Sequence, residues 1–153
     1  MKFRAETQEF VSPTSCNNTI VGIDVVGTGC LAGPVVAAAV ILNSKNPVGG
    51  IKDSKKISAK KRKVMADQIM VNALDWAIGQ ASVYEIDHYN ILRASHLAMQ
   101  RAFNALSHKA TVVLVDGNRL PDFPIDSRAI VNGDQTIPSI GAASIIAKVL
   151  GTI

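Results

Sequence analysis

The sequence predicts an α/β fold in which helices alternate with the strands of a single sheet. Two compact apolar segments near the start, 20–26 and 35–42, are rich in β-branched residues and are separated by a turn that contains glycine and proline. Further along the chain, apolar residues at helical spacing alternate with short β-branched segments. This order of elements is typical of α/β sheet proteins.

The N-terminal part of the chain is expected to form a leader followed by two strands. Residues 1–19 are polar and aperiodic, so they are predicted to be a flexible leader ahead of a domain that covers 20–153. Residues 27–34 contain three glycines and Pro34, which indicate a turn. Because β-branched residues follow this turn directly, the strands at 20–26 and 35–42 are predicted to form a hairpin.

The middle of the chain predicts two helices with one strand between them. Ser58 is a suitable N-cap for a helix from 59 to about 74. Residues 77–83 favour a strand. Ser82 and Glu85 match the capping-box pattern Ser-x-x-Glu, so one continuous helix is expected from there to about residue 107.

The last third of the chain predicts two more strands and a helix. Residues 111–115 combine four β-branched residues with one leucine, and this strand stops at the turn signal Asp116-Gly117-Asn118. A short strand at 128–131 and a helix of small residues at 139–150 complete the predicted domain.

The composition indicates a soluble globular protein. Hydrophobic residues make up 48% of the 153 residues, which fills one core and argues against intrinsic disorder. The formal net charge of +4 is compatible with a phosphate-rich partner but does not require one. The N-terminus has no apolar signal region, and the apolar run at 35–42 is too short to span a membrane. We therefore expect a cytoplasmic protein with no membrane partner.

The glycines after the first strand raise one alternative, a nucleotide-cofactor site. A dinucleotide-binding fingerprint needs its glycines to open a helix whose N-terminus holds the pyrophosphate. Pro34 and β-branched residues follow the glycines here, which argues against this interpretation. The glycines still allow backbone amides to approach a phosphate or a sugar, or they form a tight turn that binds nothing.

Two aspartates occupy positions where a carboxylate needs a partner. Asp24 lies inside an apolar strand, where its burial is costly unless it is paired or bound to a metal ion. Asp116 ends another strand, and ligands gather at strand ends in open α/β sheets. Convergence of the two on a divalent cation would suit Mg²⁺ or Mn²⁺, which take oxygen ligands. The alternative for Asp116 is an ordinary turn aspartate before glycine.

Six blocks of sequence, taken together and in order, resemble the ribonuclease HII family. The first, GIDVVGTGCLAGPVVAAAV at 22–40, is similar to the family's Asp-Glu-x-Gly-Arg-Gly block and the alanine-rich strand after it. The second, DSKKIS at 53–58, is similar to its Asp-Ser-Lys-Lys loop. The others are EID with NIL (85–92), VDGN (115–118), VNGD (131–134) and AASIIAKV (142–149).

This resemblance implies a ribonuclease H-like mixed sheet flanked by helices, and an endonuclease that hydrolyses the RNA strand of RNA–DNA hybrids or cuts at ribonucleotides embedded in a DNA duplex. It also implies a two-metal mechanism with Mg²⁺ or Mn²⁺. Asp24 and Asp116 match catalytic, metal-binding positions of the family.

The resemblance also implies contacts with the nucleic-acid substrate. Gly27 and Gly29 match the Gly-Arg-Gly segment that contacts the ribose 2′-OH, whereas Thr28 replaces its arginine. Lys55 and Lys148 match family positions near the duplex. Without the resemblance, both lysines would be ordinary surface residues.

The sequence departs from the family pattern at two expected carboxylates. Val25 stands where the family has glutamate after its first aspartate, and Thr152 stands where it has the aspartate of a Thr-Arg-Asp segment. Valine cannot ligate a metal ion, and threonine offers only a neutral oxygen. The sequence ends at Ile153, whereas family members usually continue with further helices and a stacking tyrosine, so the family's C-terminal helices are expected to be absent.

Two functional hypotheses follow from these observations. The first is a ribonuclease HII-like endonuclease whose activity is impaired. The second is a catalytically inactive remnant that at most binds a nucleic-acid duplex, which Val25, Thr28 and Thr152 favour. Metal-dependent cleavage of a duplex that carries one ribonucleotide would separate the two.

Overall fold

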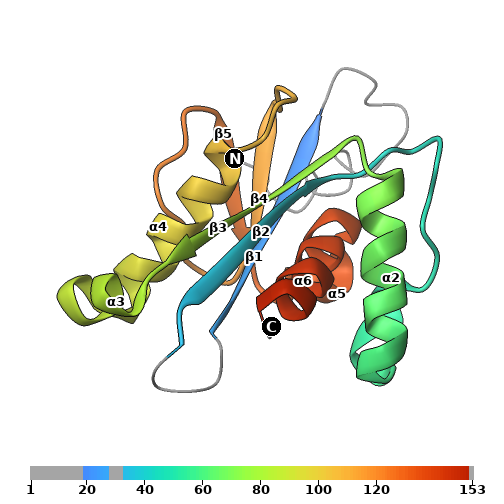
Figure 1. The fold of residues 1–153 in the computed structure, drawn as a ribbon. Helices are drawn as coiled ribbons and strands as arrows, with labels where there is room; N and C mark the ends of the chain where they lie inside the picture. The colour runs from blue at the N-terminus through green and yellow to red at the C-terminus, as the bar shows by residue number, and fades with distance from the viewer. Residues whose placement is uncertain (1–18, 28–32, 152–153) are drawn as a thin grey trace.

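Five short segments of β-branched and small residues form one mixed sheet (Figure 1). The computed structural model describes residues 19–27 and 33–151 of the chain. In space the strands follow the order β3-β2-β1-β4-β5. Neighbours in β1, β2 and β3 are antiparallel, whereas β4 runs parallel to β1 and β5 runs parallel to β4. The strands are β1 (Ile20–Gly27), β2 (Val35–Ile41), β3 (Asp75–Ala81), β4 (Val112–Asp116) and β5 (Asp126–Ile130).

Helices cover both faces of the sheet, as the α/β prediction required. Figure 1 shows α3 and α4 on one side of the sheet and α2, α5 and α6 on the other. The helical elements are the 3-10 helix η1 (Ile51–Lys56) and the α-helices α2 (Ala59–Asn72), α3 (Val83–Tyr89), α4 (Ile91–Asn104), α5 (Gly133–Thr136) and α6 (Pro138–Gly151). No helix in the described part of the chain is both long enough and apolar enough to cross a membrane.

The predicted hairpin is confirmed. β1 pairs with β2 in antiparallel register, with Gly27 opposite Val35. The chain therefore enters a second strand at Val35, where a dinucleotide-binding unit would need a helix. This arrangement removes the main structural basis for the nucleotide-cofactor alternative.

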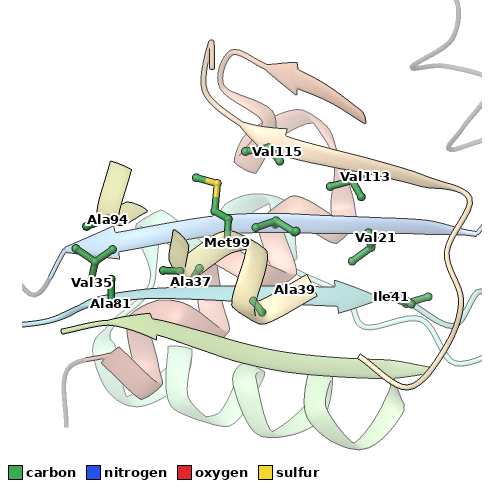
Figure 2. Close-up of a cluster of buried hydrophobic side chains, with 13 residues drawn as sticks. Val21, Val35, Ala37, Ala39, Ile41, Ala81, Ala94, Met99, Val113 and Val115 are labelled. Atoms are coloured by element: carbon green, nitrogen blue, oxygen red, sulfur yellow. The ribbon is translucent and has the colours of Figure 1, made fainter. Parts of the chain in front are cut away.

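The interior strand β2 contributes to two hydrophobic cores, because successive side chains of a strand point to opposite faces. All of β2 is buried, as expected for a strand covered by helices on both sides. Ala37 and Ala39 pack towards Met99 of α4 in the core that Figure 2 shows. Ala38 and Val40 pack towards α2 and α6 on the other face.

The single helix expected between Ser82 and residue 107 is wrong, because the chain forms two helices there. The capping box is present, with Ser82 and Glu85 each accepting a backbone N–H from the other. However, Asn90 adopts a φ of 86°, which no residue inside an α-helix adopts. α3 therefore ends at Tyr89, and the Asn90 side chain accepts the Arg93 N–H to cap α4.

Several boundaries also differ from the predictions. The strand expected at 77–83 lies at Asp75–Ala81, because Ser82 is the N-cap of α3. The strand expected at 128–131 lies at Asp126–Ile130, and the Asp-Ser-Lys-Lys segment forms η1 instead of a loop. The helix α5 was not anticipated. Most of the predicted leader, residues 1–18, lies outside the described residues.

Helix α6 lies directly against β1, which sets the position of the residues discussed next. A Cβ atom at Gly22 would collide with the backbone of Ser139 and Ile140 at the start of α6, so this approach requires glycine. Gly151 at the other end of α6 lies close to Val26. Since Gly22, Asp24 and Val26 alternate with the residues that face α4, the side chain of Asp24 faces α6.

Candidate metal centre

Three aspartates from different elements meet beside α6. They are Asp24 in β1, Asp116 at the end of β4 and Asp134 in α5. One carboxylate oxygen from each lies within 4.8 Å of the other two. The parallel pairing of β1 with β4, in which Ile23 is opposite Val115, places the next residue of each strand side by side.

Asp24 is buried in an environment that disfavours its charge. The residue is only 8% exposed. Its Oδ1 accepts the N–H of Val25 at 2.8 Å. Burial raises the pKa of Asp24 to about 7, and the charge of Asp116 adds to this effect, while hydrogen bonds from Val25 and Ser144 oppose it. The fold therefore keeps a carboxylate here at a free-energy cost that two hydrogen bonds do not offset.

Asp116 is half-buried and is oriented by the start of α5. Its Oδ1 accepts the N–H of Asp134 at 3.3 Å, and the Gly133 N–H is a second donor. Burial and then the charge of Asp134 raise the pKa of Asp116, whereas these backbone hydrogen bonds and the charge of Lys55 lower it. Asn132, in the left-handed conformation with a φ of 57°, turns the chain so that α5 can reach Asp116.

Asp134 is the carboxylate with a cationic partner. The Nζ atom of Lys55, in η1, lies 2.8 Å from its Oδ2. The Asp134 side chain is 10% exposed, and that of Lys55 is 50% exposed. The ion pair therefore connects the buried cluster to the surface on the side of η1.

The three carboxylates fit a hard divalent cation. Carboxylate oxygens are the ligands that Mg²⁺ and Mn²⁺ prefer, and these ions bind in protein sites through a few carboxylates with water and phosphate. A cation here would reverse the unfavourable burial of Asp24, because an opposite charge within a few ångströms favours the ionised carboxylate. Lys55 supplies one positive charge to three carboxylates, which leaves the group acidic enough to attract such an ion.

The remaining predicted site residues are spread around this cluster. Gly27 is the exposed last residue of β1, and no atom of the described residues lies within 4 Å of where its Cβ would be. Lys148 lies in the last turn of α6, one turn after Ser144 and on the same helix face. Thr28, Gly29 and Thr152 lie outside the described residues.

Val25 gives no ligand to the cluster. Its side chain is partly buried and packs against the core on the α4 face, while its backbone N–H is the donor to Asp24. The position next to Asp24 in β1 therefore contributes packing and a backbone hydrogen bond.

Sequence reasoning missed Asp134 as a ligand candidate. The residue was part of the quoted VNGD block, but a Gly-Asp pair in a polar segment has the pattern of an ordinary turn. Neither strand nor helix periodicity surrounds it. Only the fold brings it, across 18 residues of sequence, to within hydrogen-bonding distance of Asp116.

Comparison with known proteins places the chain in a family. A family model described as "Ribonuclease HII" matches residues 21–152. The chain belongs to the ribonuclease HII family. It is 53% identical over 131 residues to a ribonuclease HII of Vibrio vulnificus, in a match that covers 86% of this chain and 63% of that relative. The chain thus spans less than two thirds of the length of this ribonuclease HII.

Solved structures agree on the fold. The ribonuclease H2 of Pyrococcus horikoshii superposes with a TM-score of 0.76 at 24% identity, covering 87% of this chain and 72% of that one. Bst-RNase HIII in complex with Mn²⁺ superposes with a TM-score of 0.68 at 19% identity, covering 88% and 52%. The predicted ribonuclease H-like mixed sheet flanked by helices is confirmed.

Proposed function

We propose that this chain acts as a ribonuclease HII-like endonuclease, which hydrolyses the RNA strand of RNA–DNA hybrids or cuts at ribonucleotides embedded in a DNA duplex. The observation that carries the proposal is the meeting of Asp24, Asp116 and Asp134 within 4.8 Å, in a chain of this family. Val25 supplies no carboxylate where the family resemblance expects glutamate. Asp134 adds a third carboxylate to those of Asp24 and Asp116.

The three aspartates would hold Mg²⁺ or Mn²⁺. A bound divalent ion in such a site lowers the pKa of a water nucleophile and stabilises the charge on the leaving oxygen of the phosphate. The Mn²⁺ complex of a structural neighbour supports this assignment for the fold.

The chain's own residues prepare this site. The Val25 N–H and the Ser144 hydroxyl fix the orientation of the Asp24 carboxylate, and the Gly133 and Asp134 N–H groups fix that of Asp116. Preset orientation of this kind favours the reacting geometry without reorganisation during the reaction.

Substrate contacts are proposed for the surface around the cluster. Lys148 follows Ser144 by one helical turn and would meet a backbone phosphate near Asp24. Gly27 has no neighbouring atom of the described residues where its Cβ would be, and its backbone would approach a ribose there. Gly29 and Lys55 keep the substrate roles that the family resemblance implies.

A duplex-binding chain without catalytic activity is the second candidate. Val25 favours it, because the side chain beside Asp24 packs into the core and offers no ligand. In this case the positive net charge and the lysines near the cluster would still attract the phosphates of a duplex.

Cleavage of a DNA duplex that carries one ribonucleotide tests the proposal. We expect cutting with Mn²⁺ or Mg²⁺, none with a chelator, and none of an all-DNA duplex. Asp134→Asn should reduce the rate at least about 100-fold, since ion-based charge stabilisation is worth several kcal/mol. Asp67→Asn, an exposed aspartate of α2, is the matched control and should cut like wild type.

Other outcomes of this experiment choose between the candidates. Cutting that persists in Asp134→Asn would show that the cluster is not the catalytic site. Absence of cutting in wild type, with recovery in a Val25→Glu plus Thr152→Asp variant, would favour the second candidate and locate the defect in the missing carboxylates.

A further inference from the structure

We propose that Lys55 is an internal counter-ion that occupies the carboxylate cluster before a metal ion binds and that leaves Asp134 when the ion enters. The proposal rests on the metal site of the proposed function. It assigns to Lys55 a role in metal loading, which is separate from any contact with substrate. The observation behind it is the 2.8 Å ion pair between Lys55 Nζ and Asp134 Oδ2.

The Lys55 ammonium interacts with the whole cluster. Its hydrogen bond with Asp134 is the largest of the effects that raise the pKa of Lys55, and the charges of Asp116 and Asp24 act in the same direction. A cation at this position partly relieves the repulsion among three carboxylates that lie within 4.8 Å of one another. In the ion-free protein, Lys55 therefore neutralises part of the negative charge that a divalent cation would neutralise.

The fold holds Lys55 at this position. η1 is anchored by buried Ile51, whose Cγ2 atom lies against Gly141 of α6. A Cβ at Gly141 would lie 2.7 Å from that atom and 2.9 Å from the Asp134 carbonyl oxygen, so any larger residue would push η1 and α5 away from α6. The left-handed turn at Gly50, with a φ of 83°, sets the direction of η1. These contacts keep η1, and Lys55 with it, beside Asp134.

A metal ion and Lys55 compete for the same carboxylate. Oδ2 of Asp134 accepts the ammonium at 2.8 Å, and a divalent ion shared by the three aspartates needs an oxygen of Asp134 as well. The Lys55 side chain is half exposed, so its displaced ammonium is rehydrated easily, whereas the Asp134 side chain is largely buried. Competition should therefore weaken ion binding modestly without preventing it.

Mn²⁺ titration by calorimetry at pH 7 tests the proposal with Lys55→Met and the matched control Lys56→Met. Both variants remove one lysine from η1, and Lys56 is exposed. We expect Lys55→Met to bind Mn²⁺ about fivefold more tightly than wild type, equivalent to ~1 kcal/mol. Lys56→Met should change the affinity by less than about twofold, because no ion pair between Lys56 and the cluster is found among the described residues and an exposed charge is largely screened. Lys55→Arg, which retains a cation, should bind like wild type.

The outcomes separate this proposal from the proposed function. If the wild-type protein binds Mn²⁺ and Lys55→Met binds it with equal or lower affinity, the counter-ion role is overturned and the metal site is supported. Absence of Mn²⁺ binding in every variant would overturn both. Tighter binding by Lys55→Met and Lys56→Met to the same extent would show a general charge effect and also overturn the role of Lys55.

A second measurement on the wild-type protein does not depend on a variant. Amine-reactive labelling, quantified by peptide mass spectrometry, should modify Lys55 several-fold faster with saturating Mn²⁺ than with a chelator, because release from Asp134 frees the amine. Lys56 should react at the same rate in both conditions. Equal Lys55 rates with and without Mn²⁺ would contradict the proposal.

Discussion

Asp24 and Asp75 lie in strands of the same sheet, but their surroundings have opposite effects on the carboxylate. Asp75, the first residue of β3, accepts backbone N–H groups from Trp76 at 2.9 Å, Ser107 at 2.6 Å and His108 at 2.9 Å. Partial burial raises the pKa of Asp75, but these three donors outweigh it and the pKa is lowered. Asp24 has one backbone donor, deeper burial and two carboxylate neighbours, and its pKa is raised.

The difference separates a carboxylate that the protein itself satisfies from one that it does not satisfy. The hydrogen bonds of Asp75 tie the end of the segment after α4 to the start of β3, so the protein itself satisfies this charge. Asp24 is left with a charge that the polypeptide does not satisfy. Such uncompensated burial marks functional positions more often than structural ones.

The largest expected difference between substitutions of Asp24 and Asp75 is in catalysis. Asp24→Asn should reduce metal-dependent cleavage of a ribonucleotide-containing duplex at least about 100-fold, because the amide is a weak, neutral ligand. Asp75→Asn should retain cleavage in conditions where it is folded, because Asp75 lies outside the cluster. Single-turnover rates with Mn²⁺ measure both. A similar loss in the two variants would mean that the effect of Asp24→Asn is not specific to the carboxylate cluster.

The next largest effect is on the pH dependence of stability in the metal-free protein. The folded-state pKa of Asp24 is about 7 and its ordinary value is 3.8, so the folded state binds the proton more strongly. Stability from this group is therefore lost as pH rises from about 4 to about 7, by up to about 4 kcal/mol. Asp24→Asn should remove this loss and should be more stable than wild type at pH 8.

Denaturant unfolding with a chelator, at intervals from pH 4 to pH 8, measures this effect. The difference in unfolding free energy between Asp24→Asn and wild type should grow with pH and level off above the pKa of Asp24. A difference that stays constant across this range would indicate that Asp24 does not titrate in the folded protein as described.

The smallest effect is expected at Asp75. Asp75→Asn should lower the free energy of unfolding by about 1–2 kcal/mol at pH 7, because charge-assisted hydrogen bonds from Ser107 and His108 are weakened. Since the pKa of Asp75 is lowered on folding, its contribution is present above the ordinary value of 3.8 and is lost as pH falls through the folded value. The contributions of Asp24 and Asp75 to the free energy of unfolding should therefore change with pH in opposite directions.

A matched control for Asp75 is available in the same sheet. Asp126 is also the first residue of a strand, but it is exposed. Asp126→Asn should change the free energy of unfolding by less than about 0.5 kcal/mol, as for most surface substitutions. An equal loss in Asp126→Asn and Asp75→Asn would assign the effect to strand starts in general and not to the three donors.

Much of the fold was predictable because local patterns and tertiary packing agree. The β-branched segments at β1, β2 and β4 are buried strands, and the small residues predicted to form a helix at 139–150 lie in α6, which packs closely on β1. The break between α3 and α4 was not predictable, because Asn90 in a polar helical pattern gives no sign of a positive φ. Asparagine tolerates such a conformation better than most residues, but it does not require it.

The candidate site was predictable only where a carboxylate contradicts its local pattern. Asp24 in an apolar strand and Asp116 at a strand end stood out from the sequence, and the fold brings the two together. Asp134 and the pairing of Lys55 with it arise from the long-range packing of η1 and α5 on α6, which no local pattern encodes. The substrate contacts of Gly27, Gly29, Lys55 and Lys148, and the loss of a carboxylate at Thr152, remain predictions.

A crystal structure of the protein with Mn²⁺, with anomalous diffraction to locate the ion, tests the central claim most directly. We predict an anomalous peak that places Mn²⁺ among the carboxylate oxygens of Asp24, Asp116 and Asp134, and no peak at Asp75. Absence of a peak at the three aspartates under saturating Mn²⁺, or a peak elsewhere, would contradict the account.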